Sequence, residues 1–367
     1  MFISHEREFV MIQRVFIVIA SFVALFSYSA RLARAQAAPL QMTGKPAFQG
    51  KAYRFDKIAD GVYYATATGS MITGGNNVVI VNDRDVLVVD ANTTPAAARE
   101  MLAEIKMITP KPVRFVVDTH FHYDHTDGNM VYAPTAEIIA TDYVREMLAH
   151  HDVLHTEPYK TSVGSLPTQI DALKKQAAAE KDPAKRADLE KEIKAMQDEI
   201  VQVKETKPTP PTMTFKSQLT LYRGNREIQL LFLGRGHTEG DTVVYLPKEK
   251  IVCTGDLMES RPAYMGSAVF DEWIKTLDAL KKLDFNTVLP GHGVPFHDKA
   301  LITAWQSYLQ DLITQVAALR KQGLTADQAA QKVDLRSHAS AFPQITAVGA
   351  DLRGVRRVYE WMDETRR

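Results

Sequence analysis

The 367-residue sequence contains one cysteine, Cys253, so no intramolecular disulfide can form. It has no excess charge of either sign, because 44 basic residues balance 44 acidic ones. A neutral chain has no long-range field to attract nucleic acid or an anionic membrane surface, so neither is an expected partner. The most apolar run, residues 15–30, is shorter than the roughly 20 residues that span a bilayer.

That apolar run belongs to an N-terminal segment typical of a secretory signal. Arg14 precedes the run, and residues 33–35 and 35–37 each offer an A-x-A cleavage site. We therefore expect a signal peptide over residues 1–37, a periplasmic or secreted protein, and no stable membrane association after cleavage. An uncleaved anchor or a buried helix are the alternatives, and Met11 is a second candidate start.

The chain from about residue 60 to 118 has the pattern of strands broken by turns. Residues 94–108 predict a helix, with Thr94 as its cap and Pro95 in its first turn. The continuous apolar stretch 113–117 predicts a strand that is buried on both faces and runs into "THFHYDHTDGN" at 119–129. This motif therefore lies in a loop at the end of a strand, where α/β proteins commonly place their chemistry.

A segment rich in Ala, Lys and Glu interrupts the strand pattern and predicts an inserted helical hairpin over residues 165–206. Asp182-Pro183 divides it into two halves. We expect a hairpin that packs on itself, a cap over the active site, or an arm that forms a homodimer. The second half carries an apolar stripe at coiled-coil spacing, formed by Leu189, Ile193, Met196, Ile200 and Val203.

Strands and a helix return after the insertion, and residues 301–367 predict C-terminal helices that pack on the main domain, residues 50–300. Two similar blocks of strands followed by a helix therefore flank the insertion. They indicate an α/β fold in which two sheets form a sandwich with helices outside.

The motif at 119–129 offers four candidate metal ligands. His120 and His122 are two apart on extended backbone, so their side chains point to the same side, and Asp124 and His125 follow where the chain leaves the strand. Imidazole nitrogen and carboxylate oxygen suit Zn²⁺.

Three more candidates share the same context, a strand end that runs into a loop: His237 in "GRGHTEGD", Asp256 in "VCTGDLMES" and His292 in "VLPGHGVP". All seven together suffice for two metal ions with a carboxylate between them and positions left open for water. Cys253 lies inside an apolar strand and predicts a buried structural thiol.

H-x-H-x-D-H, G-H-T, G-D and P-G-H-G, in this order, resemble the metallo-β-lactamase superfamily over nearly all of residues 55–300 apart from the insertion. The resemblance implies an αββα sandwich with two zinc ions at one edge of the sheets. It implies that Asp256 bridges them. The first ion would be held by His120, His122 and His237, and the second by Asp124, His125 and His292.

The chemistry that follows is hydrolysis by a hydroxide shared between the metals. Asp124 orients this nucleophile and passes its proton to the leaving group, so it is the predicted catalytic residue. The expected partner is a small-molecule substrate with a carbonyl group, a β-lactam or a lactone first.

Local motifs are closest to the three-histidine zinc β-lactamases, with two departures. Those enzymes have a cysteine at the position of Asp256. At the position of Glu259 they have a lysine, which binds the carboxylate of the substrate. In having aspartate at position 256, the chain instead resembles the lactonases, the glyoxalase-II-type thioesterases and the phosphotriesterase-like members of the superfamily. Arg261 is a candidate replacement for the lysine, and Tyr264 a candidate donor to the substrate.

Other interpretations stay open. A thioester or phosphotriester hydrolase of the same fold would use the same residues, with Fe or Mn in place of zinc as a further possibility. A mononuclear iron dioxygenase for a sulfur substrate has a related fold but fewer protein ligands. His150, His151 and His155 begin the insertion, and one hypothesis is that they line its entrance.

Overall fold

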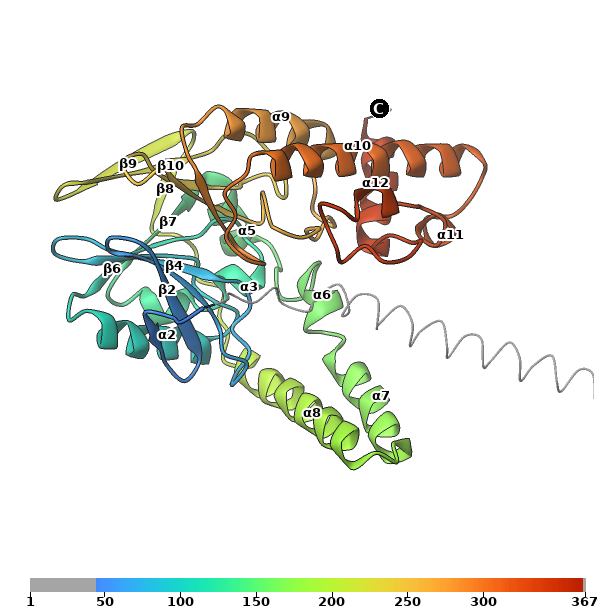
Figure 1. Cartoon of the computed structure of the whole chain (residues 1–367), viewed down its shortest axis with the longest axis horizontal. Coiled ribbons are helices and arrows are strands. Elements are labelled where there is room, and N and C mark those ends of the chain that lie inside the picture. Colours follow the sequence, from blue (N-terminus) through green and yellow to red (C-terminus); the bar gives the residue numbers. More distant parts are fainter. Residues whose placement is uncertain (1–43, 366–367) are drawn as a thin grey trace, which may run out of the picture.

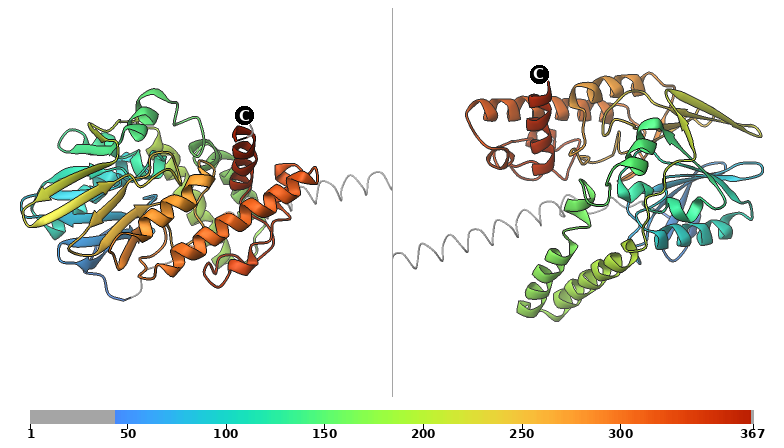
Figure 2. Two further views of the ribbon diagram at one scale, coloured as in Figure 1. Left: turned by 90° about the horizontal axis from the view of Figure 1, so that it is seen from above. Right: turned by 180° about the vertical axis from the view of Figure 1, so that it is seen from behind.

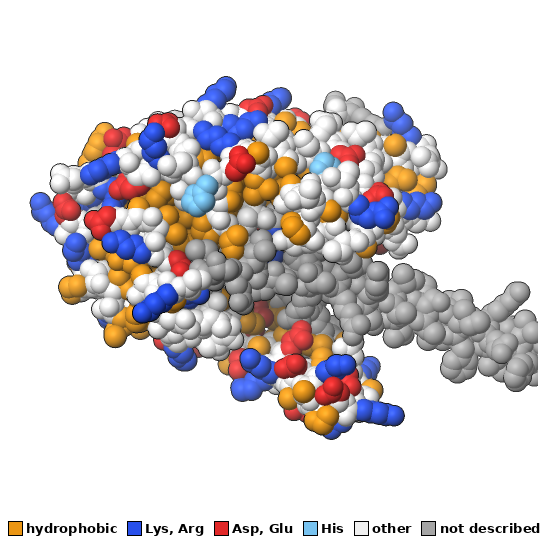
Figure 3. Space-filling model, in the orientation of Figure 1, with side chains coloured by type: hydrophobic (Ala, Val, Ile, Leu, Met, Phe, Trp, Pro, Cys, Tyr) orange, Lys and Arg blue, Asp and Glu red, His pale blue; other side chains and the backbone are white. Residues whose placement is uncertain are grey.

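The computed structural model describes residues 44–365 (Figure 1). The predicted signal peptide and its cleavage sites lie outside the described residues. Within the described part of the chain, no helix is long and apolar enough to cross a membrane. The face drawn in Figure 3 shows basic and acidic side chains interspersed.

The first sheet has eight strands in chain order, antiparallel from β1 to β5 and parallel from β5 to β8. Side chains alternate between its two faces, so Val79 and Val88 pack toward the outer helices while Ile80 and Leu87 face the second sheet. The strands are β1 (Phe48–Gln49), β2 (Tyr53–Ala59), β3 (Val62–Ala67), β4 (Asn77–Val81), β5 (Val86–Val89), β6 (Val113–Val117), β7 (Glu137–Thr141) and β8 (Met213–Phe215).

Helix α2 (Pro95–Ile108) covers the outer face of this sheet. Thr94 caps it as predicted, because its side chain accepts a hydrogen bond from the Ala97 N–H. Met101 and Ile105 are buried in the same cluster as the strand residues. The short helix α4 (Asn129–Tyr132) packs on α2, and α5 (Asp142–His150) packs on β7. Helix α3 (Tyr123–Thr126) is formed by residues of the motif at 119–129.

The second sheet has the order β13-β12-β11-β10-β9, with β12 and β13 parallel. One face packs on the first sheet, and Cys253 lies buried there as predicted. The other face packs on Trp273 and Trp305, from two helices. The elements are β9 (Gln218–Arg223), β10 (Arg226–Leu231), β11 (Val243–Leu246), β12 (Ile251–Gly255), β13 (Thr287–Pro290), α9 (Phe270–Lys281) and α10 (Ala300–Lys321).

Helices, sheet, sheet and helices therefore follow one another, which confirms the predicted αββα sandwich (Figure 2). Beyond α10 the chain forms α11 (Ala326–Ala330), η1 (Arg336–His338) and α12 (Leu352–Glu364), which pack on the side of the second sheet.

The segment 158–206 forms an arm that extends from the sandwich (Figure 1). It contains α6 (Tyr159–Ser162), α7 (Leu166–Ala179) and α8 (Pro183–Val203). Asp182 caps α8, so the break between the two long helices falls at the predicted Asp-Pro pair. The apolar stripe of α8 packs in one cluster with residues of α6 and α7, and this cluster also includes Tyr123 of the metal motif.

Candidate metal centre

All seven predicted ligands lie at one edge of the sandwich. The motif at 119–129 follows β6, Asp256 follows β12 and His292 follows β13, and parallel neighbours bring these carboxyl ends to the same edge. His237 joins them from the loop between β10 and β11.

The first group consists of His120, His122 and His237, all buried. His122 Nδ1 lies 3.0 Å from His120 Nε2 and 3.1 Å from His237 Nε2. Three nitrogens around one tetrahedral zinc, each about 2.0–2.1 Å from it, lie roughly 3.4 Å apart, so this spacing fits one ion.

The outer ring nitrogens of two of these histidines have their own partners. His122 Nε2 lies 3.0 Å from Ser267 Oγ, and His120 Nδ1 lies 3.1 Å from Thr119 Oγ1. Such contacts fix the orientation of a metal-binding imidazole.

The second group consists of Asp124, His125 and His292. Asp124 Oδ2 lies 3.0 Å from His292 Nε2 and 3.6 Å from His125 Nε2. The side chains of Asp124 and His292 are each 18% exposed, so this group faces the pocket.

Asp256 lies between the two groups. Its Oδ2 is 3.7 Å from His237 Nε2 and 3.5 Å from His292 Nε2, and its Oδ1 is 3.4 Å from His125 Nε2. A single carboxylate therefore reaches histidines of both groups, as a bridging ligand must.

Unpaired polar atoms support a metal at this place. His125 Nε2 and Asp256 Oδ1 are buried and have no hydrogen-bond partner among the described residues. Buried polar groups are almost always satisfied, and these two atoms face each other at 3.4 Å, which is longer than an ordinary hydrogen bond. A divalent cation fits both, which makes the donor set suited to the predicted zinc ions.

Electrostatics divides the histidines into two kinds. Burial lowers the pKa of His120 and His122 well below the ordinary value and that of His237 to about 4, so these rings are neutral and offer lone pairs. Burial alone would also lower the pKa of His125 and His292, but the carboxylates beside them raise both.

The carboxylates respond in the opposite sense. Burial alone would raise the pKa of Asp124 and Asp256, but the neighbouring histidines hold both below the ordinary value. Both side chains are therefore ionised, the form in which carboxylates bind metals.

Asp90 is a functional residue that the sequence reasoning missed. It directly follows β5 with a positive φ of 65°, and its Oδ2 lies 2.8 Å from His125 Nδ1. Its Oδ1 accepts a hydrogen bond from the Thr119 N–H at 2.8 Å. Asp90 thus holds the first residue of the metal motif and one predicted ligand together. The only signal was an aspartate at the end of the apolar strand "VLVVD".

Gly291 explains why the P-G-H-G motif needs a glycine before its histidine. A Cβ built on Gly291 would lie 2.3 Å from Asp256 Oδ1 and 3.0 Å from His125 Cε1. Any other residue would displace these two side chains.

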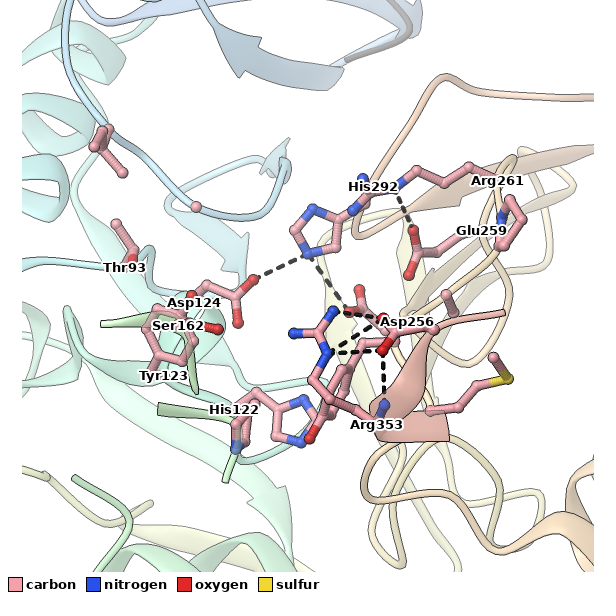
Figure 4. A pocket seen from close by; sticks show the side chains of 18 of the residues that line it. Thr93, His122, Tyr123, Asp124, Ser162, Asp256, Glu259, Arg261, His292 and Arg353 are labelled. Atoms are coloured by element: carbon pink, nitrogen blue, oxygen red, sulfur yellow. Dashed lines mark hydrogen bonds and ion pairs between the residues drawn. The ribbon is translucent and has the colours of Figure 1, made fainter. Parts of the chain in front are cut away.

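A pocket of about 360 Å³ opens over the two groups (Figure 4). The predicted substrate residues Arg261 and Tyr264 both line it, as does Glu259. Arg261 Nε donates to Glu259 Oε2 at 2.9 Å, and the Tyr264 ring lies edge-on to His122 with 5.5 Å between centroids. Burial, with the nearby Asp256 adding to it, raises the pKa of Glu259 to about 7.

Two other segments complete the pocket wall. A cap over the active site was one of the alternatives predicted for the arm, whereas the contribution of α12 was not predicted from the sequence. Pro158, Ser162 and Glu199 come from the inserted arm, and Asp351 and Arg353 from the start of α12. No spacing in the sequence connects these residues to the metal motif, because only tertiary packing brings them there.

The hypothesis that His150, His151 and His155 line an entrance is wrong. All three are exposed and none lines the pocket. They lie at the end of α5 and in the turn after it, where His155 Nδ1 pairs with Asp152.

A family model described as the metallo-beta-lactamase superfamily matches residues 72–292. The chain belongs to this superfamily. The described residues place candidate His/Asp metal-binding groups within the matched region.

Among characterised relatives, a linear primary-alkylsulfatase of Pseudomonas sp. is 24% identical over 75% of this chain and 53% of its own length. The 2,4-dinitroanisole O-demethylase subunit alpha of Nocardioides sp. is 24% identical over 64% of this chain and 54% of its own. The chain thus spans about half the length of these relatives. A metallo-beta-lactamase type 2 of Bacillus cereus is 32% identical over 23% of this chain and 35% of its own.

Solved structures of the superfamily also match. A metallo-beta-lactamase from Pontibacter korlensis aligns at 18% identity and a TM-score of 0.49, covering 70% of this chain and 99% of its own. The DIM-1 metallo-beta-lactamase aligns at 21% identity with the same TM-score, over 71% of this chain and 97% of its own.

Proposed function

We propose that this protein is a dinuclear zinc hydrolase that opens a small carbonyl substrate, with a lactone or β-lactam as the first candidates. The observation that carries the proposal is the position of Asp256 between two groups of three ligands. A set of seven protein ligands favours two metal ions and a hydrolytic reaction over a single iron ion and an oxidation. Fe or Mn are the alternative metals for the same ligands.

Two zinc ions held here would supply Lewis acidity and a water of lowered pKa at neutral pH. Asp124 is ionised and faces the pocket, so its carboxylate can accept a proton from that water and deliver it to the leaving group. Tyr264 also lines the pocket, so its hydroxyl is a candidate donor to the carbonyl oxygen. Asp90 keeps His125 in its orientation.

The position of Glu259 in the pocket disfavours a β-lactam as the natural substrate. Its carboxylate lies in the pocket wall where β-lactamases have a cation, although Arg261 partly neutralises it. Between the two first candidates the residues therefore favour a lactone.

A sulfate ester is the second candidate. The alkylsulfatase matches three quarters of this chain, and two arginines, Arg261 and Arg353, line the pocket. Thioester and phosphotriester substrates complete the set of compounds to be screened.

We also propose that residues 1–37 direct export to the periplasm or the medium and are then removed. The inserted arm is a candidate surface for a homodimer, and no nucleic acid or membrane partner is proposed. The intact mass of the exported protein would locate the cleavage site. An exported chain that keeps residues 1–37 would contradict the proposed removal of this segment.

The replacement Asp124→Asn tests the mechanism. We expect kcat to fall by about 10²–10⁴-fold, because the amide cannot take up the proton. The assay uses zinc-loaded protein and a screen with a homoserine lactone, a cephalosporin, a thioester, a phosphotriester and an alkyl sulfate.

Asp188→Asn, an exposed aspartate of α8, is the matched control and should keep full activity. Undiminished turnover in Asp124→Asn, with an unchanged circular dichroism spectrum, would contradict the assigned role.

A further inference from the structure

The C-terminal helix α12 forms one wall of the pocket although it lies outside the family match at 72–292. Two contacts hold it there. Arg357 Nε donates to the Ala268 carbonyl at 3.0 Å, and Gly354 lies so close to Met265 that an added Cβ would be 3.0 Å from Met265 Cε. The start of α12 is thus fixed against the loop that follows Asp256.

Arg353 is the residue that α12 directs toward this pocket (Figure 4). Its Nε donates to Asp351 Oδ1 at 3.0 Å and its Nη2 to Asp351 Oδ2 at 2.6 Å. Among the described residues, Nη1 has no hydrogen-bond partner. The side chain is 33% exposed, so one edge of the guanidinium is held by a carboxylate while the remaining donors are free for a ligand.

The guanidinium lies close to the metal ligands. Its carbon is 4.8 Å from the centroid of the Tyr264 ring, and the same ring lies 5.5 Å from His122 and 6.2 Å from His237, measured between centroids. A substrate that reaches both Arg353 and the metal centre therefore needs only a few bonds between its two contact points.

Arg261 repeats this arrangement elsewhere in the wall. A buried carboxylate, Glu259, holds its Nε, while its Nη atoms have no hydrogen-bond partner among the described residues. Both arginines are thus oriented before any ligand arrives, which reduces the entropic cost of binding. The pocket lining also includes the apolar side chains of Pro262, Ala263 and Met265.

We propose that Arg353 binds an oxyanion carried by the substrate, a carboxylate or a sulfate, while the bond to be broken lies at the metal centre. This inference rests on the proposed function and narrows its substrate class to small amphiphilic anions. Arg353 acts here as a specificity-determining residue. It would select a carboxylate ester by a carboxylate that takes no part in the reaction, and a sulfate ester by the charge of the sulfate group itself.

Paired substrates test the proposal. Hydrolysis of the anionic ester 4-nitrophenyl succinate and of the neutral ester 4-nitrophenyl butyrate is measured with the metal-loaded protein. In Arg353→Gln the ratio of the two kcat/KM values, anionic over neutral, should fall at least about tenfold, because a charge-assisted hydrogen bond is lost. Arg353→Lys should restore part of the ratio.

Arg356→Gln is the matched control, since Arg356 is an exposed arginine of the same helix that pairs with Asp327. It should leave the ratio unchanged. An equal fall for both esters in Arg353→Gln would show a merely structural role and overturn the proposal.

Calorimetric affinities for hexanesulfonate and hexanoate provide a readout that needs no turnover. We expect Arg353→Gln to weaken at least one of them about tenfold or more, and the larger loss identifies the kind of anion. Unchanged affinities for both would overturn the subsite. If the wild-type protein hydrolyses neither ester, the proposed function fails for this substrate class, and the affinities alone then decide the subsite.

Discussion

At the scale of single residues, Asp90 shows how a side chain that need not touch metal supports the centre. It receives hydrogen bonds from the Thr119 backbone and contacts His125 Nδ1 at 2.8 Å. The positive φ of Asp90 turns the chain at the end of β5 so that this carboxylate points to the motif. Its loss should therefore affect metal binding more than the fold.

Replacing Asp90 by Ala should lower zinc affinity by about 10–100-fold, because a metal-bound histidine loses the partner that orients it. Competition with a chromophoric chelator measures this affinity. Asp83→Ala, an exposed aspartate in the turn after β4, should keep the wild-type value. Wild-type affinity in Asp90→Ala would contradict the supporting role.

The two kinds of histidine predict that metal binding depends on pH in two steps. The raised pKa values of His125 and His292 mean that protons compete with metal at the second group even near neutrality. The pKa values of His120, His122 and His237 are lowered by burial, so the first group stays free of protons at pH values well below the ordinary imidazole pKa of about 6.5.

As pH falls through the range in which the raised pKa values of His125 and His292 lie, the second ion should therefore dissociate before the first. Metal content after dialysis at a series of pH values, determined by mass spectrometry, checks this order. Loss of both ions in one step would contradict it.

The seven candidate ligands could be selected from the sequence because each follows a strand end in a recognisable motif. That they lie together was not derivable from spacing alone, since His237 and His292 reach His120 only through the packing of the two sheets. Arg353 had no such signal: its place depends on how α12 contacts the Met265 loop.

At the scale of elements, the inserted arm is connected to the metal motif through one aromatic residue. Tyr123 lies between predicted ligands, and its ring packs edge-on against Tyr159 of α6 with 5.5 Å between centroids. The composition of the arm and the coiled-coil spacing of its apolar residues predicted its helices, but not this contact. The arm is thus both a wall of the pocket and a support for the motif.

Tyr123→Ala should destabilise the protein by about 2 kcal/mol, less than the 3–5 kcal/mol of a fully buried aromatic residue, because the ring is only partly buried. Urea denaturation of the metal-loaded protein measures this change. Tyr222→Ala, an exposed tyrosine of β9, should change stability little. Equal stability in the two variants would mean that the arm does not support the motif.

At the scale of the whole molecule, the sandwich explains why chemistry gathers at one edge. Parallel pairs in both sheets, β5 with β6 and β12 with β13, end at this edge, and the arm and the C-terminal helices surround it (Figures 1 and 2). Strand periodicity and the order of blocks were enough to predict this architecture. The packing of residues 301–365 against the pocket depends on contacts between distant side chains, which periodicity does not encode.

We propose that seven side chains hold two zinc ions with Asp256 between them, and the metal content of the purified protein decides whether they do. Elemental mass spectrometry of the purified protein should find two zinc ions per chain in the wild type. Asp256→Asn should retain at most one, because the amide is a poor bridge between cations. A single iron per chain, or two ions held equally well by Asp256→Asn, would contradict the account.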